Sequence, residues 1–136
     1  MKVGFIGCGN MGSALAKAVS KVSLTNIYLF DTNPEKCDLL AKEIGAEITS
    51  MENIAKECDF IYMAVKPAII RSALAELNAP LSENKNAAVV SMAAGVKIEA
   101  IEGALPSGTP VIRIMPNTSG AIGMGVTAYA KNASVS

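Results

Sequence analysis

The stretch VGFIGCGNMG, residues 3–12, decides the fold that this sequence predicts. Its first four residues are typical of a short buried strand, and Gly7, Gly9 and Gly12 follow at once in the pattern GxGxxG. Beyond the glycines, apolar residues recur at steps of three and one, which places one apolar stripe on a helix: Met11, Ala14, Leu15, Ala18, Val19 and Val22. The order of strand, glycine turn and helix predicts a unit that binds a dinucleotide.

The same alternation continues along the chain. Further strands are predicted at residues 27–30, 60–65, 87–92, 111–115 and 126–130, and helical periods follow most of them. Pro67 and Pro116 are expected to end the third and fifth of the chain's strands. This order predicts a Rossmann-type, doubly wound α/β fold, with a mostly parallel sheet and helices on both faces. Residues 1–130 are expected to form this dinucleotide-binding domain, and residues 131–136 a polar C-terminal end.

Composition narrows the class of protein. The chain has 136 residues, of which 51% are hydrophobic, and its 12 basic side chains balance 12 acidic ones. That balance argues against a nucleic-acid partner, and no apolar run approaches the roughly 18 residues that span a membrane. Three cysteines without any CxxC pair, in a chain without histidine, argue against a metal site and favour a reducing, cytoplasmic location.

The glycine pattern has a physical reason at each position. Gly7 permits a tight turn, Gly9 lets a pyrophosphate approach the backbone, and Gly12 lets the helix pack closely on the strand. The helix N-terminus offers unpaired N–H groups and about half a positive charge to the anion. The alternative is a glycine-rich turn that binds no ligand.

An acid stands at the end of the second predicted strand. Asp31 lies nineteen residues past Gly12, where a carboxylate can accept hydrogen bonds from the adenosine ribose hydroxyls, and this favours NAD. The 2′-phosphate of NADP would bring a charge near −2 against the carboxylate, although Thr32 and Asn33 can still donate hydrogen bonds to it. The alternative makes Asp31 a turn or helix-capping acid before Pro34.

Later strand ends carry further candidates. Lys66 is either a contact for a phosphate or a substrate carboxylate, or a solvated lysine at a strand end. The small residues after Ser91 either let a flat nicotinamide ring approach closely or form a plain turn. Arg113 in an apolar strand needs either a bound anion or a structural ion pair.

Four strings in order resemble pyrroline-5-carboxylate reductases: FIGCGNMG at 5–12, AVKP at 64–67, SMAAGV at 91–96 and RIMPNT at 113–118. The resemblance covers essentially the entire chain, but only the first half of the family's length. It implies reduction of 1-pyrroline-5-carboxylate to L-proline in proline biosynthesis, with hydride from NAD(P)H. Ser119 stands where the family usually has proline. Asp31 stands where most relatives keep a neutral or basic neighbourhood and favour NADPH, so NAD keeps only a modest edge.

The resemblance also implies a set of cofactor contacts. Ile6, Gly7, Cys8, Gly9, Asn10 and Met11 would hold the pyrophosphate, Thr32 and Asn33 would flank the ribose or its phosphate, Ala64, Val65, Lys66 and Pro67 would line the cofactor, and Met92, Ala93, Ala94 and Asn117 would lie by the nicotinamide. Family members continue into a helical C-terminal domain that makes the homo-oligomer and supplies most of the substrate pocket. We therefore assign no catalytic residue, and we expect this chain to bind the dinucleotide without turning over substrate unaided.

Two other functions stay open at this point. One is a related reductase with the same cofactor half, of the coenzyme F420-dependent NADP reductase or β-hydroxyacid dehydrogenase type. The other is a non-catalytic module whose occupancy by a nucleotide biases contact with a partner.

Overall fold

The computed structural model describes residues 2–8, 10–21, 26–84, 87–92, 97–106, 108–117 and 125–131. At residues 10, 11, 67, 114–117 and 125–131 it describes the backbone alone.

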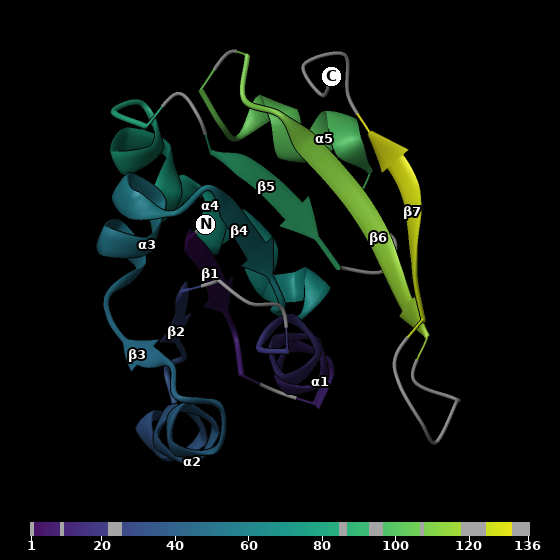
Figure 1. Cartoon of the computed structure of the whole chain (residues 1–136). Helices are drawn as coiled ribbons and strands as arrows, with labels where there is room; N and C mark the ends of the chain where they lie inside the picture. Colours follow the sequence, from purple (N-terminus) through teal and green to yellow (C-terminus); the bar gives the residue numbers. More distant parts are fainter. Residues whose placement is uncertain are drawn as a thin grey trace.

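The described strands form one sheet in the order β3-β2-β1-β4-β5-β6-β7 (Figure 1). Their bounds are β1 Lys2–Ile6, β2 Asn26–Phe30, β3 Glu47–Ile48, β4 Phe60–Met63, β5 Ala88–Ser91, β6 Val111–Asn117 and β7 Gly125–Lys131. All neighbours pair in parallel except β6 and β7, which are antiparallel. The strand order reverses beside β1, so the predicted doubly wound, mostly parallel fold is confirmed.

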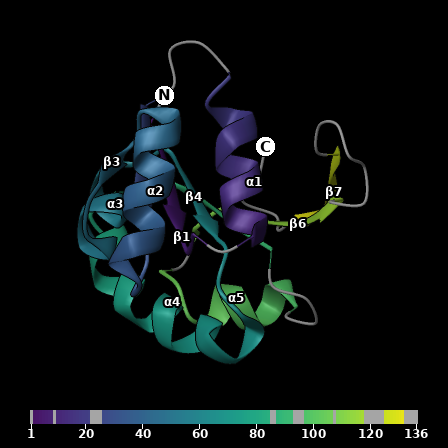
Figure 2. The ribbon, with the colours of Figure 1, turned by 90° about the horizontal axis from the view of Figure 1, so that it is seen from below.

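Helices cover both faces of this sheet. They are α1 Asn10–Val19, α2 Pro34–Ile44, α3 Met51–Glu57, α4 Pro67–Leu81 and α5 Ile98–Gly103. Figure 2 shows α1 and α2 on one face and α4 and α5 on the other. Among the helices of the described residues, none is long and apolar enough to cross a membrane.

The ends of α2 follow local chemistry that the sequence predicts. The Asn33 side chain accepts a hydrogen bond from the Glu35 N–H at 3.1 Å, and Pro34 begins the helix, where its missing N–H costs nothing. Gly45 ends the helix with φ at +71°, a left-handed conformation that glycine adopts without strain. These caps set the direction in which α2 leaves the end of β2.

Two hydrophobic cores lie on opposite faces of the sheet. One lies under α1 and α2 and includes Val3, Phe5 and Leu29, and the other lies under α3, α4 and α5. β4 contributes to both cores: Ile61 and Met63 belong to the second core, while Phe60 and Tyr62 pack against the first. The ring of Tyr62 stacks on that of Phe5 at 4.7 Å between centroids. The prediction that this strand is apolar on both faces is confirmed.

Two predicted strand ends are wrong by two residues. β4 stops at Met63 rather than at 65, because β1 and β5 both stop pairing with it there. β6 continues to Asn117 through Pro116, the residue that was expected to end it. Pairing of β6 with β5 ends at Arg113, so from there on only β7 pairs with the strand, and a proline is tolerated where one side of the ladder is open.

We expect the protein to lose stability at alkaline pH through Cys58, which packs beside Ile54 under Gly4. Burial and, to a lesser extent, the charge of Asp59 together raise the pKa of this thiol from 9.0 to about 12. Above pH 9 the unfolded thiol ionises while the folded one keeps its proton, so the free energy of unfolding falls by about 1.4 kcal/mol per pH unit for this group. Below pH 9 both states keep the proton, so Cys58 adds no pH dependence to the free energy of unfolding.

Urea unfolding of wild type and Cys58→Ala at about pH 8 and about pH 10 measures this effect. The stability difference between the two proteins should shrink at the higher pH, because alanine removes the titrating thiol. A difference that stays constant would contradict a raised Cys58 pKa.

Candidate functional site

Residues that directly follow four neighbouring strands gather at one edge of the sheet. Gly7, Asp31, Ala64 and Met92 follow the last residues of β1, β2, β4 and β5, which are adjacent in the order β2-β1-β4-β5. Parallel strands end at the same edge, so residues far apart in the sequence meet there. The structure thus brings together the main segments that the sequence predicts as a cofactor site.

The glycine turn after β1 is packed without spare room. The Gly7 N–H donates to the Phe30 carbonyl oxygen at 2.7 Å, and φ at Gly7 is +107°. A Cβ on Gly7 would collide with the Ala64 carbonyl oxygen, and one on Gly12 would collide with the Gly7 carbonyl oxygen and lie 2.9 Å from Ala64 Cβ. The tight turn and the close helix packing expected of these two glycines are present.

Asp31 ties the glycine turn to the end of β2. Its Oδ2 accepts the Cys8 N–H at 2.6 Å, and its Oδ1 accepts the Asn33 N–H at 2.8 Å. The carboxylate is therefore a turn acid, as the alternative interpretation had it. Each oxygen has a second lone pair, and the residue is only half-buried, so a ribose hydroxyl can still donate to it.

The start of α1 is suited to an anion. The helix has ten residues and no acidic side chain in its first turn, so nothing on it offsets the positive end of its dipole. The Ser13 hydroxyl donates to the Cys8 carbonyl oxygen at 2.8 Å and so braces the turn from the helix side. Sequence reasoning missed Ser13, although its place directly after GxGxxG was the available signal.

The other predicted residues take different positions. Thr32 and Asn33 are exposed beside Asp31, but the Asn33 side chain is occupied as the cap of α2. Lys66 is exposed directly before α4, as a solvated lysine would be.

The remaining predicted residues lie along the same edge or outside the described ranges. Ala64, Val65 and Met92 are half-buried, Asn10 and Met11 begin α1, Pro67 begins α4, and Asn117 ends β6. Gly9, Ala93 and Ala94 lie outside the described residues. Arg113 is half-buried in β6, in register with Ser91 of β5 and Ala130 of β7.

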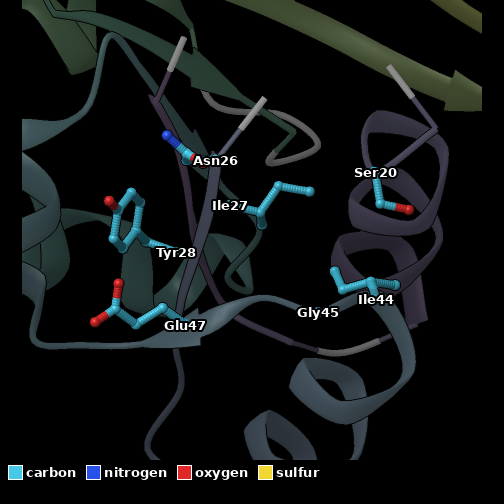
Figure 3. Close-up of a pocket in the computed structure, with 7 residues that line it drawn as sticks. All are labelled: Ser20, Asn26, Ile27, Tyr28, Ile44, Gly45 and Glu47. Carbon is cyan, nitrogen blue, oxygen red and sulfur yellow. The ribbon is translucent and has the colours of Figure 1, made fainter. Parts of the chain in front are cut away.

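A separate hollow of about 170 Å³ lies at the other edge of the sheet (Figure 3). Its lining includes Asn26 at the start of β2, Ser20 just after α1, and Ile44 and Gly45 at the end of α2. It shares no residue with the predicted cofactor contacts, and it lies where strands begin rather than end. We therefore do not assign it to the cofactor. Within the described ranges, no three cysteine or carboxylate side chains gather closely enough to hold a metal ion.

Comparison with known proteins places this geometry among nicotinamide-dependent enzymes. Residues 2–95 match the family described as NADP oxidoreductase, coenzyme F420-dependent. The pyrroline-5-carboxylate reductase of Escherichia coli K12 is 38% identical over 98% of this chain and 51% of its own length.

Two solved structures are similar as well. A pyrroline-5-carboxylate reductase from Coxiella burnetii aligns with TM-score 0.83 and 30% identity over 98% of this chain and 50% of its own. A pyrroline carboxylate reductase from Plasmodium falciparum, with NADP bound, aligns with TM-score 0.72 and 30% identity over 87% of this chain and 43% of its own. The resemblance indicated by the four strings is confirmed, and the chain spans about half the length of the curated relatives it matches.

Proposed function

This chain belongs to the family of coenzyme F420-dependent NADP oxidoreductases, and from that premise we propose that it binds NAD(P)H and supplies the cofactor half of a pyrroline-5-carboxylate reductase. The observation that carries the proposal is the glycine turn at the carboxyl edge, closed by Gly12 against Gly7 and Ala64. Close packing of this kind brings the start of α1 directly to the end of β1, where the unpaired amides of the helix can meet a pyrophosphate.

Each part of the dinucleotide has a candidate place on this edge. The Cys8 N–H is already bound by Asp31, so the amides at the start of α1, from Asn10 on, are the donors we assign to the pyrophosphate. Asp31 accepts from the adenosine ribose. Ala64, Val65 and Met92 border the nicotinamide end with apolar surface that keeps water away. When bound, NAD(P)H supplies the hydride.

The substrate assignment rests on the relatives. Relatives that are 38% and 39% identical are named pyrroline-5-carboxylate reductase, and the reaction we propose is reduction of pyrroline-5-carboxylate to L-proline in proline biosynthesis. Because the chain matches about half of each relative, we infer that the substrate contacts come from the unmatched half. The homo-oligomer that the resemblance implies, and a cytoplasmic location that three unpaired cysteines favour, belong to the same proposal.

Titration calorimetry of the chain with NADH and NADPH tests cofactor binding. We expect a dissociation constant in the micromolar range for at least one of them, about −8 kcal/mol. ATP serves as a control, because it offers phosphates and adenine without the nicotinamide. Absence of binding of either dinucleotide to folded protein would contradict the proposal.

A chimera tests the substrate. This chain joined to the unmatched half of the Escherichia coli relative should oxidise NADPH or NADH when pyrroline-5-carboxylate is added, while the chain alone should not exceed background. A chimera that folds and binds the dinucleotide but ignores this substrate would refute the assigned reaction.

A further inference from the structure

The sulfur atoms of two buried cysteines are in contact in the core between the glycine turn and α2. Cys8 Sγ, in the turn, lies 3.4 Å from Cys37 Sγ, which projects from α2. Both residues are nearly inaccessible, at 4% and 1% exposure. Both cysteines are free, and their sulfurs are separated by 29 positions in the sequence. Neither Cys37 nor this contact has a part in the proposed dinucleotide contacts.

We propose that Cys8 and Cys37 form a reversible disulfide in the presence of hydrogen peroxide, and that this disulfide weakens dinucleotide binding. The effect on dinucleotide binding rests on the proposed function. A disulfide requires a sulfur separation of about 2 Å, so the two atoms must approach by about 1.4 Å. The distance between the two sulfur atoms is already shorter than the sum of their van der Waals radii. Among the chain's three cysteines, this pair is therefore the nearest to forming a bond.

The reaction balances with peroxide as the oxidant. One thiol loses its proton, and its sulfur attacks a peroxide oxygen, which breaks the O–O bond and gives a sulfenic acid and one water. The second sulfur then attacks the sulfenic sulfur, loses its proton, and releases a second water. The two cysteines together lose two hydrogens and two electrons, and the peroxide is reduced to two waters. A small-molecule thiol such as dithiothreitol reverses the bond by exchange.

Proximity, rather than ionisation, selects this pair. Burial raises the pKa of the Cys8 thiol, as do Cys37 and Asp31, while Lys36 lowers it. Burial also raises the pKa of Cys37. The hydrogen bond from Cys8 lowers this pKa, and the charges of Asp31 and Asp38 raise it. The thiolate fraction at neutral pH is therefore small, so oxidation is slow and should speed up as the pH rises.

The backbone contacts of Cys8 connect the sulfur pair to the proposed dinucleotide site. The Cys8 N–H is held by Asp31 and its carbonyl oxygen by Ser13, so a pull on the Cys8 side chain is transmitted to β2 and α1. Gly7 and Gly12 are packed too tightly on Ala64 for the turn to shift freely. Movement of the sulfurs toward each other therefore displaces the start of α1 or of α2, both of which border the proposed site.

The test compares peroxide-treated and reduced protein. Mass spectrometry of proteolytic peptides should find Cys8 joined to Cys37 with the loss of two hydrogens, and calorimetry should find NADH or NADPH bound at least tenfold more weakly. Dithiothreitol should reverse both changes. Bound dinucleotide should slow the oxidation, since coupling between two binding equilibria is reciprocal.

Two single variants complete the design. Cys37→Ala should bind the dinucleotide as the reduced wild type does and should lose all sensitivity to peroxide. Cys58→Ala removes the buried cysteine of the opposite core and should still form the Cys8–Cys37 bond. Failure to find that bond in folded wild type, or an unchanged affinity once it has formed, would overturn the inference. If reduced protein binds no dinucleotide, the proposed function fails, and peptide mapping still decides whether the sulfur pair is oxidised.

Discussion

Replacing Gly12 with alanine should weaken the binding of NADH and NADPH at least tenfold and lower the free energy of unfolding by about 2 kcal/mol. The added methyl group would collide with the Gly7 carbonyl oxygen and lie 2.9 Å from Ala64 Cβ. Neither neighbour is the end of a flexible side chain, so relief requires α1 to move away from the turn. That movement carries the amides at the helix start away from the pyrophosphate. Calorimetric titration and urea unfolding measure the two losses.

Gly103→Ala is the matched control for this substitution. Gly103 also lies in a helix, as the last residue of α5, but a Cβ there would meet nothing within 4 Å. We expect its stability to stay within about 0.5 kcal/mol of wild type and its dinucleotide affinity to stay unchanged. A Gly12→Ala protein that bound the dinucleotide as well as Gly103→Ala does would show that close packing of the turn is not what makes the site.

The parts of the fold that the sequence predicts well are those specified by short-range signals. The strand, glycine turn and helix of the first unit follow from a change of apolar period over residues 3–19, and α2 follows from Asn33, Pro34 and Gly45 at its ends. The residues that make up each of these signals belong to a single turn or a single helix. Chain order and the handedness of crossovers then leave few sheet topologies to choose from.

The parts that were missed depend on which elements become neighbours. The hydrogen bond from Cys8 to Asp31 spans 23 positions, and it exists because β2 pairs with β1 in a register that aligns Ile6 with Phe30. An acid at the end of this strand can accept a hydrogen bond from the glycine turn, or it can accept only from a ribose hydroxyl. No local sequence pattern distinguishes the two cases. The continuation of β6 through Pro116 likewise depends on where β5 stops, which the residues around the proline do not encode.

Asp31→Asn should shift cofactor preference toward NADPH, raising the ratio of NADPH affinity to NADH affinity at least tenfold. The carboxylate lies at the end of β2, and a 2′-phosphate bound beside it would carry a charge near −2. At the effective dielectric constant of a protein surface, this repulsion amounts to about 1–3 kcal/mol, and asparagine removes it while keeping the side chain's shape. Wild type should accordingly bind NADH more tightly than NADPH. Paired titrations with the two dinucleotides measure the ratio.

A change in the ratio has to be separated from simple loosening of the turn, because Asp31 also holds the Cys8 and Asn33 amides. Asp59→Asn provides that separation. Asp59 Oδ2 accepts the Lys2 N–H at 2.9 Å, so it too joins an acid to the backbone of β1, but at the edge where β1 begins. The control should leave the ratio of the two affinities unchanged. If Asp31→Asn also leaves it unchanged while lowering both affinities together, Asp31 acts only by holding the turn, and the choice between NADH and NADPH is made by other residues.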